Sequence, residues 1–275
     1  MRILFLVRIQ QLMGVAVLLL EDIIQATTRF AEESSLNLAK DLNDLQIFDP
    51  PLLAVAAADD PLFESLKEED AVGPQHLSPN QWLPGSRAVV SYFLPFTQPV
   101  RKANRTMGLA AVEWLYGRIE GEMFNNGLRR FLAEYFTAAG FQAIVPPHDP
   151  RFKVVSRRSN WSERHVAFIA GLGTFSLSRS MITKAGSAGR FGSVIVNADL
   201  VATPRYYSER EENCSKCGAC IPRCPPLAIT EAGKDNAVCS DFLDRVKIRF
   251  EPRYGCGKCQ AGVPCESGIP VKKHS

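Results

Sequence analysis

The cysteines constrain this chain most, because all eight lie between residues 214 and 265. Four of them form the run Cys214-Ser-Lys-Cys217-Gly-Ala-Cys220-Ile-Pro-Arg-Cys224-Pro225. Three cysteines at intervals of three, then a fourth followed by proline, is the spacing of bacterial proteins with two [4Fe–4S] clusters. In such proteins the first three thiolates bind one cluster and the fourth binds the other. The run therefore predicts two clusters and a second group of cysteines downstream.

The downstream group exists and completes both ligand sets. We predict that one cluster is held by Cys214, Cys217, Cys220 and Cys265, and the other by Cys224, Cys239, Cys256 and Cys259. Structural zinc is one alternative, although zinc usually takes two separated Cys-x-x-Cys pairs. Disulfides are the other, but they require an oxidising compartment and rarely use such tight spacing. The spacing favours iron–sulfur clusters over both.

The uneven distribution of cysteine predicts two domains. Residues 1–207 contain none and form a cysteine-free α/β body, whereas residues 208–275 form a ferredoxin-like module with two [4Fe–4S] clusters. The hydrophobic content of 46% and the charged content of 22% are typical of soluble globular proteins. Eight thiols available for iron favour a reducing compartment, most simply the cytoplasm. A net charge of +3 gives little support to a nucleic-acid partner.

The first 20 residues are apolar but interrupted. Arg2, Arg8, Gln10 and Gln11 break the stretch, and a membrane span needs about 20 predominantly apolar residues. A signal peptide would show one uninterrupted apolar region and a cleavage site. We therefore expect neither a membrane anchor nor export, but a buried strand or helix or an extension before Met13.

Hydrophobic periodicity predicts alternating helices and strands. Helices are expected at 21–45, 61–67 and 161–171, and two more within 107–139, separated near Asn125-Asn126-Gly127. Strands are expected at 52–57, 88–94, 141–145 and 190–197. This alternation predicts an α/β or α+β body.

Three segments carry a resemblance to a known family. They are Ser159-Asn-Trp-Ser-Glu-Arg-His165, Gly171-Leu-Gly-Thr-Phe175, and Gly186-Ser-Ala-Gly-Arg190-Phe-Gly192-Ser193. Together with the cysteine runs, including Tyr254-Gly-Cys256-Gly-Lys-Cys259-Gln260, they resemble the epoxyqueuosine reductase family and the related corrinoid reductive dehalogenases. The resemblance covers roughly residues 80–265, with specific motifs only after about 159.

The resemblance implies a nitroreductase-like body that holds cobalamin and receives electrons through the two clusters. The residues that it implies for the corrinoid site are Gly171, Leu172, Gly173, Gly192 and Ser193. Arg190 would bind an anionic substrate or a side chain of the cofactor. Without the family, glycines at a helix end and in a turn more often serve the conformation of the backbone.

The chain departs from the family at defined positions. Arg157 stands where epoxyqueuosine reductases carry an Asp that acts as proton donor, and Thr174 replaces the Trp of Gly-Leu-Gly-Trp. Cys259 and Cys265 are separated by five residues, and Glu266 replaces the usual proline. The missing acid argues against reduction of epoxyqueuosine in tRNA.

Glu163 and His165 are the candidate catalytic residues, because a carboxyl or an imidazole near the cofactor can move protons. Two alternatives stand beside this role. Asn160 and Glu163 have the spacing of a variant capping box, in which Glu163 would cap the following helix. His165 would then satisfy only a local hydrogen bond.

These features predict an iron–sulfur oxidoreductase that takes electrons from an external low-potential donor and acts on a small molecule. One alternative is an electron-transfer protein that serves a partner redox protein. Another is a reductase that reactivates the corrinoid of a partner. An enzyme should have an enclosed pocket in the body facing the nearer cluster, whereas a carrier should expose a cluster edge and lack that pocket.

Overall fold

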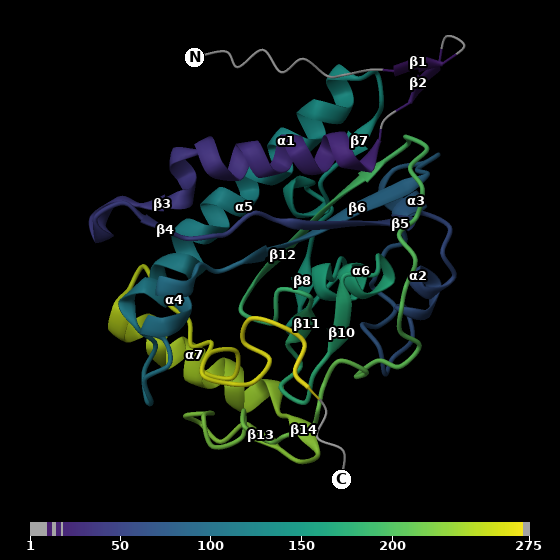
Figure 1. Ribbon diagram of the computed structural model, residues 1–275. Coiled ribbons are helices and arrows are strands. Elements are labelled where there is room, and N and C mark those ends of the chain that lie inside the picture. The colour runs from purple at the N-terminus through teal and green to yellow at the C-terminus, as the bar shows by residue number, and fades with distance from the viewer. Residues whose placement is uncertain (1–9, 13–14, 18, 272–275) are drawn as a thin grey trace.

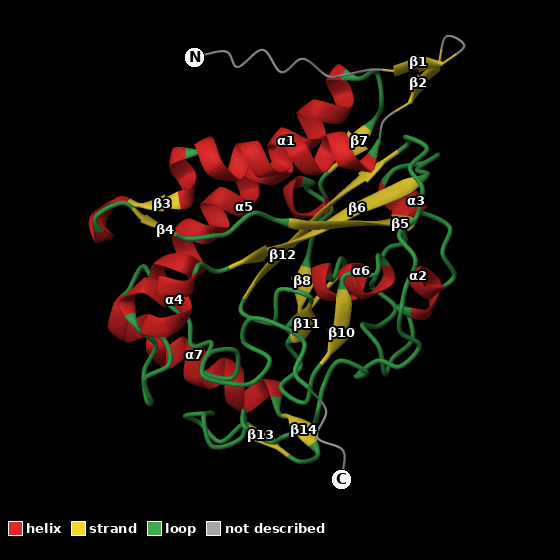
Figure 2. Cartoon of the chain, in the orientation of Figure 1, coloured by secondary structure: helices red, strands yellow, loops and turns green. Residues whose placement is uncertain are grey.

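The computed structural model describes residues 10–12, 15–17 and 19–271. Its centre is an antiparallel four-stranded sheet with the order β5-β6-β12-β7 (Figures 1 and 2). The sheet strands are β5 (Leu52–Ala57), β6 (Ala88–Pro95), β12 (Gly189–Val196) and β7 (Ala143–Ile144). The helices are α1 (Leu20–Glu33), α2 (Leu62–Ser65), α3 (Pro79–Trp82), α4 (Gln98–Ala103), α5 (Val112–Ala138), α6 (Glu163–Ile169) and α7 (Asn236–Phe250).

Shorter elements connect these. The antiparallel pairs are β1 (Gln10–Leu12) with β2 (Val15–Val17), β3 (Leu38–Ala39) with β4 (Leu45–Gln46), β8 (Val154–Val155) with β9 (Arg158–Ser159), β10 (Gly173–Phe175) with β11 (Met181–Thr183), and β13 (Ile229–Thr230) with β14 (Gly233–Lys234). Single 3₁₀ turns lie at Ser35–Asn37, Lys40–Leu42 and Pro146–His148.

Both faces of the sheet are covered, and β6 is buried along its whole length. Side chains of a strand alternate between the two faces. Val90 and Tyr92 accordingly lie in an apolar core with α1 and α5, while Val89 and Phe93 lie in a second core with α6. Figure 1 shows α1 and α5 above the sheet and α6 below it. The site described below lies at the end of this layered body.

The mixed α/β composition of the body is confirmed, and because every strand pair is antiparallel the body is of the α+β kind. The predicted strands at 52–57, 88–94 and 190–197 are present, whereas the strand predicted at 141–145 is limited to the two residues of β7. The short helices predicted at 61–67 and 161–171 are present within narrower bounds.

The helix predicted at 21–45 ends at Glu33, so the second half of that prediction was wrong. The buried Asn37 side chain holds the chain in a turn there: its amide donates to the carbonyls of Ala31 and Phe48, and its oxygen accepts from the Phe48 N–H. The apolar residues after the turn therefore face the core from β3 and β4 rather than from a helix.

The predicted break in the helical pattern at 107–139 was also wrong. A single helix, α5, runs through Asn125-Asn126-Gly127. Asn125 is buried and accepts a hydrogen bond from the Tyr92 hydroxyl at 2.7 Å, while Gly127 lets the Leu36 side chain approach the helix closely. Tertiary contacts thus outweigh the weak helix propensity of these residues.

The expectations for the first 20 residues lie largely outside the described residues, which there include only β1, β2 and the residues from 19 onward. No helix within residues 10–12, 15–17 and 19–271 is both long and apolar enough to cross a membrane.

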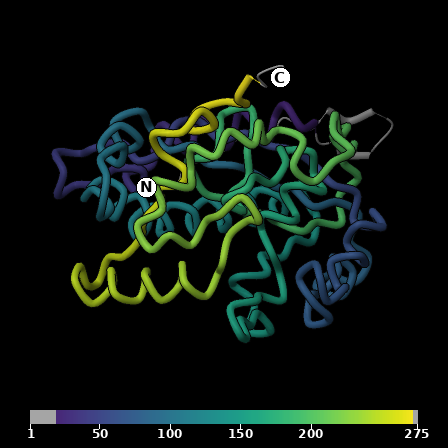
Figure 3. Tube along the Cα trace, turned by 90° about the horizontal axis from the view of Figure 1, so that it is seen from below, coloured from purple at the N-terminus to yellow at the C-terminus, as the bar shows by residue number. Residues whose placement is uncertain are grey.

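After β12 the chain first runs beside β5, where Thr203 bonds to Val55, and the residues from about 208 onward lie across the lower end of the body (Figures 1 and 3). Val246 of α7 and Ala261 belong to the same apolar core as α5. The cysteine-containing segment, residues 208–271 of the described chain, is therefore packed against the body rather than held only by a linker.

We predict that Leu128→Ala lowers the free energy of unfolding by about 2–5 kcal/mol, because its fully buried side chain leaves a cavity between α5 and the sheet. The matched control on the same helix is Met123→Ala, whose side chain is 56% exposed and should cost no more than about 0.5 kcal/mol. Chemical denaturation measures both. Equal losses for the two variants would contradict the described orientation of α5.

Candidate functional site

A cavity of about 530 Å³ lies between the body and the cysteine-containing segment. Its body wall comes from α5, α6 and the start of β12, and its other wall comes from β14, α7 and residues 254–260. The volume is within the range of small-molecule sites. The cavity faces the thiols, as expected for an enzyme, but it is partly open to solvent rather than enclosed.

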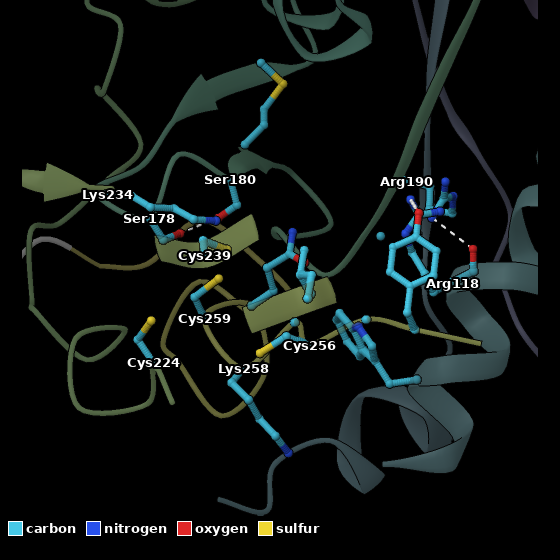
Figure 4. Close-up of a pocket in the computed structure, with 18 of the residues that line it drawn as sticks. Arg118, Ser178, Ser180, Arg190, Cys224, Lys234, Cys239, Cys256, Lys258 and Cys259 are labelled. Atoms are coloured by element: carbon cyan, nitrogen blue, oxygen red, sulfur yellow. Dashed lines mark hydrogen bonds between the residues drawn. The ribbon is translucent and has the colours of Figure 1, made fainter. Parts of the chain in front are cut away.

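The eight cysteines fall into two groups of four in the structure. Cys224, Cys239, Cys256 and Cys259 line the large cavity (Figure 4). Cys214, Cys217, Cys220 and Cys265 line a second, smaller cavity. We call these the inner set and the outer set. They are the same two groups that the spacing predicted, although their role as cluster ligands remains a prediction.

The donor chemistry of each set fits a four-thiolate cluster. All eight cysteines are free thiols, so the disulfide alternative does not describe this structure. Among the described residues, no three His, Cys, Asp or Glu side chains lie close enough to hold a single metal ion. Burial raises the pKa of Cys220 and Cys256 to about 12, so cluster binding would displace protons from these thiols.

The loop between the last cysteines of the inner set is anchored on the end of α4. Lys258 is fully buried, and its ammonium donates to the backbone carbonyls of Asn104 and Thr106 at 3.2 and 2.7 Å. Arg223 donates to the Lys258 carbonyl and to the same end of α4. Cations suit a helix C-terminus because its last carbonyls are unpaired and carry partial negative charge.

Glu266, which stands in place of the family's proline, makes a second anchor. It is buried and forms an ion pair with Arg105 at 2.7 Å. Its carboxylate also accepts from the Gly262 N–H at 2.5 Å, and the Arg105 guanidinium lowers the pKa of Glu266 against the opposing effect of burial. The substitution therefore fixes the loop that carries Cys265 to the body.

The body wall of the cavity contains a network of charged side chains. Glu163 is the first residue of α6, and its carboxylate accepts from Ser193 Oγ at 2.6 Å and from Arg129 Nη2 at 3.1 Å. Burial raises the pKa of Glu163, while Arg129 acts against this rise. Glu163 does not cap α6, so the capping-box interpretation was wrong: the Asn160 amide instead bonds to the backbone of residues 151–153.

The network continues along α5. Glu122 accepts from Arg129 at 2.8 Å and pairs closely with Arg190. Arg118 donates to the Tyr254 hydroxyl at 2.6 Å, and its carbonyl accepts from Arg190. Burial, and then the neighbouring Arg118, lower the pKa of Arg190 to about 9. Figure 4 shows Arg190 and Arg118 facing the cavity from the side opposite the cysteines.

His165 does not line this cavity. Its Nδ1 lies 2.7 Å from Ser162 Oγ, and its ring packs 4.8 Å from Phe175. Burial lowers the pKa of His165 to about 3, so the ring stays neutral at physiological pH. These contacts match the local hydrogen-bonding role that stood as the alternative.

The residues that the resemblance assigned to a corrinoid pack against protein atoms. A Cβ on Gly173 would lie 2.1 Å from the Ile182 carbonyl oxygen, and one on Gly192 would lie 2.3 Å from the Tyr92 hydroxyl. Gly171, with φ of +93°, ends α6 next to the backbone of residues 203–204. Leu172 and Ser193 are buried, and of the six assigned residues only Arg190 lines the cavity. The described residues thus do not form a corrinoid cradle at these positions.

The other departures from the family have local structural roles. Arg157, at the tip of the β8–β9 hairpin with φ of +66°, forms an ion pair with Asp241 of α7 at 2.9 Å. Thr174 is buried, and its hydroxyl accepts from the Asn213 N–H at 2.8 Å, directly before Cys214.

The sequence analysis missed the part of the network on α5. Arg118, Glu122, Asn125 and Arg129 recur every three or four residues, which places them on one face of a helix. Polar residues at this spacing within a buried helix were the available signal. It was hidden because Asn125-Asn126-Gly127 was interpreted as a break.

The chain is similar to curated epoxyqueuosine reductases. It is 27% identical over 220 residues to the enzyme of Francisella cf. novicida, a match that covers 72% of this chain and 58% of that protein. It is 25% identical over 233 residues to the enzyme of Bacillus cereus, with 77% and 55% covered. The chain thus spans just over half the length of these relatives. No family model matches it.

Solved structures share the fold. Epoxyqueuosine reductase from Bacillus subtilis, solved with its catalytic loop swung out of the active site, has a TM-score of 0.51 at 17% identity, covering 93% of this chain and 68% of that one. A reductive dehalogenase whose structure suggests a mechanism for B12-dependent dehalogenation has a TM-score of 0.53 at 13% identity, covering 80% and 30%. The predicted resemblance to these two groups of proteins is confirmed.

We predict that acid destabilises the fold through His165. Because the pKa of His165 is lower in the folded state, the unfolded state binds a proton at this residue more tightly. The free energy of unfolding is therefore unaffected above the ordinary histidine pKa of about 6.5 and falls as the pH drops below it. Lowering the pH from 7.5 to 5.5 should cost about 1.4 kcal/mol from this group, and His165→Gln should reduce the loss by that amount. Urea unfolding of both proteins at both pH values measures it. The same acid-induced loss in parent and variant would show that His165 is not held neutral.

Proposed function

We propose that this protein is an iron–sulfur oxidoreductase that binds two [4Fe–4S] clusters and reduces a small molecule in the cavity between the body and the cysteine-containing segment. One observation carries the proposal: a cavity of about 530 Å³ has four thiols on one wall and the Glu163–Arg129–Glu122–Arg190 network on the other. The similarity to reductases supports it.

The clusters would supply single electrons at low potential. The outer set is the entry point, because Cys217 is exposed while its three partners are half-buried. Cys220 of the outer set and Cys259 of the inner set pack in one small apolar cluster, so the two sites adjoin. Electrons from an external low-potential donor would thus pass from the surface to the cavity.

The body would hold the small molecule and supply protons. Burial raises the pKa of Glu163, which suits this carboxyl to deliver a proton to a reduced ligand better than an exposed carboxyl would. Ser193 and Arg129 hold its two oxygens and fix its position. Eight thiols kept for iron fit a reducing compartment such as the cytosol.

An electron carrier without chemistry of its own is the second candidate, and the exposed Cys217 favours it. The cavity beside the inner set favours the enzyme, because a carrier has no need of one. The missing acid at Arg157 still argues against epoxyqueuosine as the substrate, since no acidic residue replaces it in the β8–β9 hairpin.

Anaerobic reconstitution tests the cluster content. We expect about eight irons and about eight acid-labile sulfides per chain, four of each per cluster. Cys256→Ala and Cys217→Ala should each retain about half of the iron, because they remove ligands of different clusters. Ser215→Ala, next to Cys214, is the matched control and should retain all of it. Loss of all iron in both cysteine variants would contradict two separate clusters.

A visible-spectrum titration of the reconstituted protein with cob(II)alamin tests for a corrinoid. Five of the six residues that the resemblance assigned to a corrinoid lie away from the cavity, so we derive no step through this cofactor and expect no saturable binding. Saturable binding of about one equivalent of cob(II)alamin, with a change in its visible spectrum, would overturn this expectation and favour a corrinoid reductase or reactivating protein.

A further inference from the structure

Two cations face the inner set without a carboxylate partner among the described residues. Arg164 of α6 and Lys234 of β14 both line the large cavity together with Cys239 and Cys259. The Arg164 side chain donates to the Arg179 carbonyl at 2.8 Å, a neutral partner. Figure 4 shows Lys234 beside Cys239. Arg164 interacts electrostatically with Cys239 and Cys259 and, as a like charge, with Arg179, while Lys234 interacts with Cys259.

The outer set has a different electrostatic environment. Its neighbouring cation, Lys216, lies 3.9 Å from the Glu211 carboxylate and is exposed. Cys217 is exposed as well, so water screens charges there. Among the residues that line the two cavities, the outer set has one largely neutralised cation, Lys216. The inner set has Arg164, Lys234 and Lys258 without a carboxylate partner, and the Lys258 ammonium is bound to the end of α4.

A four-thiolate cluster becomes more negative when it accepts an electron. Enclosure alone would disfavour this reduced state, because desolvation penalises the additional charge. A cation fixed beside the cluster acts in the opposite direction, because its charge favours the more negative state. Arg164 and Lys234 line the same cavity as the inner set and have no carboxylate partner among the described residues, so their charges should outweigh the effect of enclosure.

We propose that Arg164 and Lys234 are the counter-ions of the cluster at the inner set and hold its reduction potential above that of the cluster at the outer set. The inference rests on the proposed function. An external one-electron donor is oxidised as the outer cluster is reduced. The outer cluster is then reoxidised as the inner cluster gains the same electron, and no bond or proton changes place. Electrons therefore accumulate beside the cavity.

Redox titration of reconstituted protein, followed by electron paramagnetic resonance, tests this inference. In Arg164→Gln and in Lys234→Gln, at a fixed solution potential, the ratio of reduced to oxidised inner cluster should fall at least about tenfold. For a one-electron couple this is a downward shift of about 59 mV. The reduction potential of the outer cluster should not change in these variants. Arg164→Lys should keep most of the parent potential of the inner cluster, because lysine keeps the positive charge.

In the Cys217→Ala background only the inner cluster should remain, so the paramagnetic signal that persists there is assigned to the inner cluster. Lys216→Gln is the matched control: it removes an exposed, paired cation beside the outer set and should leave the inner cluster unchanged. Unchanged potentials in both glutamine variants with both clusters loaded would overturn the inference alone. Equal shifts of both clusters would also overturn it. A parent protein that cannot load two clusters would instead overturn the proposed function, as its iron content would show.

Discussion

The attachment of the cysteine loop to the end of α4 is the interaction on which the site depends. The Lys258 ammonium is buried and hydrogen-bonded to carbonyls at the end of a helix, where partial negative charge gathers. Gly257 beside it packs so closely against the Trp114 ring that a Cβ could not be accommodated. These contacts bring Cys256 and Cys259 to the body and so create the cavity. A buried amine costs free energy unless it is fully hydrogen-bonded, and three acceptors surround this one.

Opposite the cysteines, the cavity wall is polar because α5 presents a charged face to a buried space. Glu122 and Glu163 each accept from Arg129, so neither carboxylate is left unpaired in the cavity. The wall thus combines fixed charges with one carboxyl of raised pKa. A hydrophobic wall would cost less free energy, so stability alone does not explain these charged side chains.

The residues at which the chain departs from epoxyqueuosine reductases make specific contacts in the structure. Arg157 pairs with α7, Thr174 holds the backbone in front of Cys214, and Glu266 ties Cys265 to the body. All three contacts join the body to the cysteine-containing segment. The departures therefore affect how the two parts are held together as well as the chemistry.

Local spacing and hydrophobic periodicity were enough to predict the two groups of cysteines, three of the sheet strands and the α/β character. The sequence also indicated Glu163 and Arg190. Tertiary packing sets the end of α1 at Glu33 and carries α5 through Asn125-Asn126-Gly127, since Asn37 and Asn125 have buried partners far away in the chain. The spacing on α5 indicates that its charged residues share one face, but their partners Glu163 and Arg190 come from distant segments. The anchoring of Lys258 on the end of α4 and the place of Arg164 in the cavity likewise depend on segments that meet only in the folded chain.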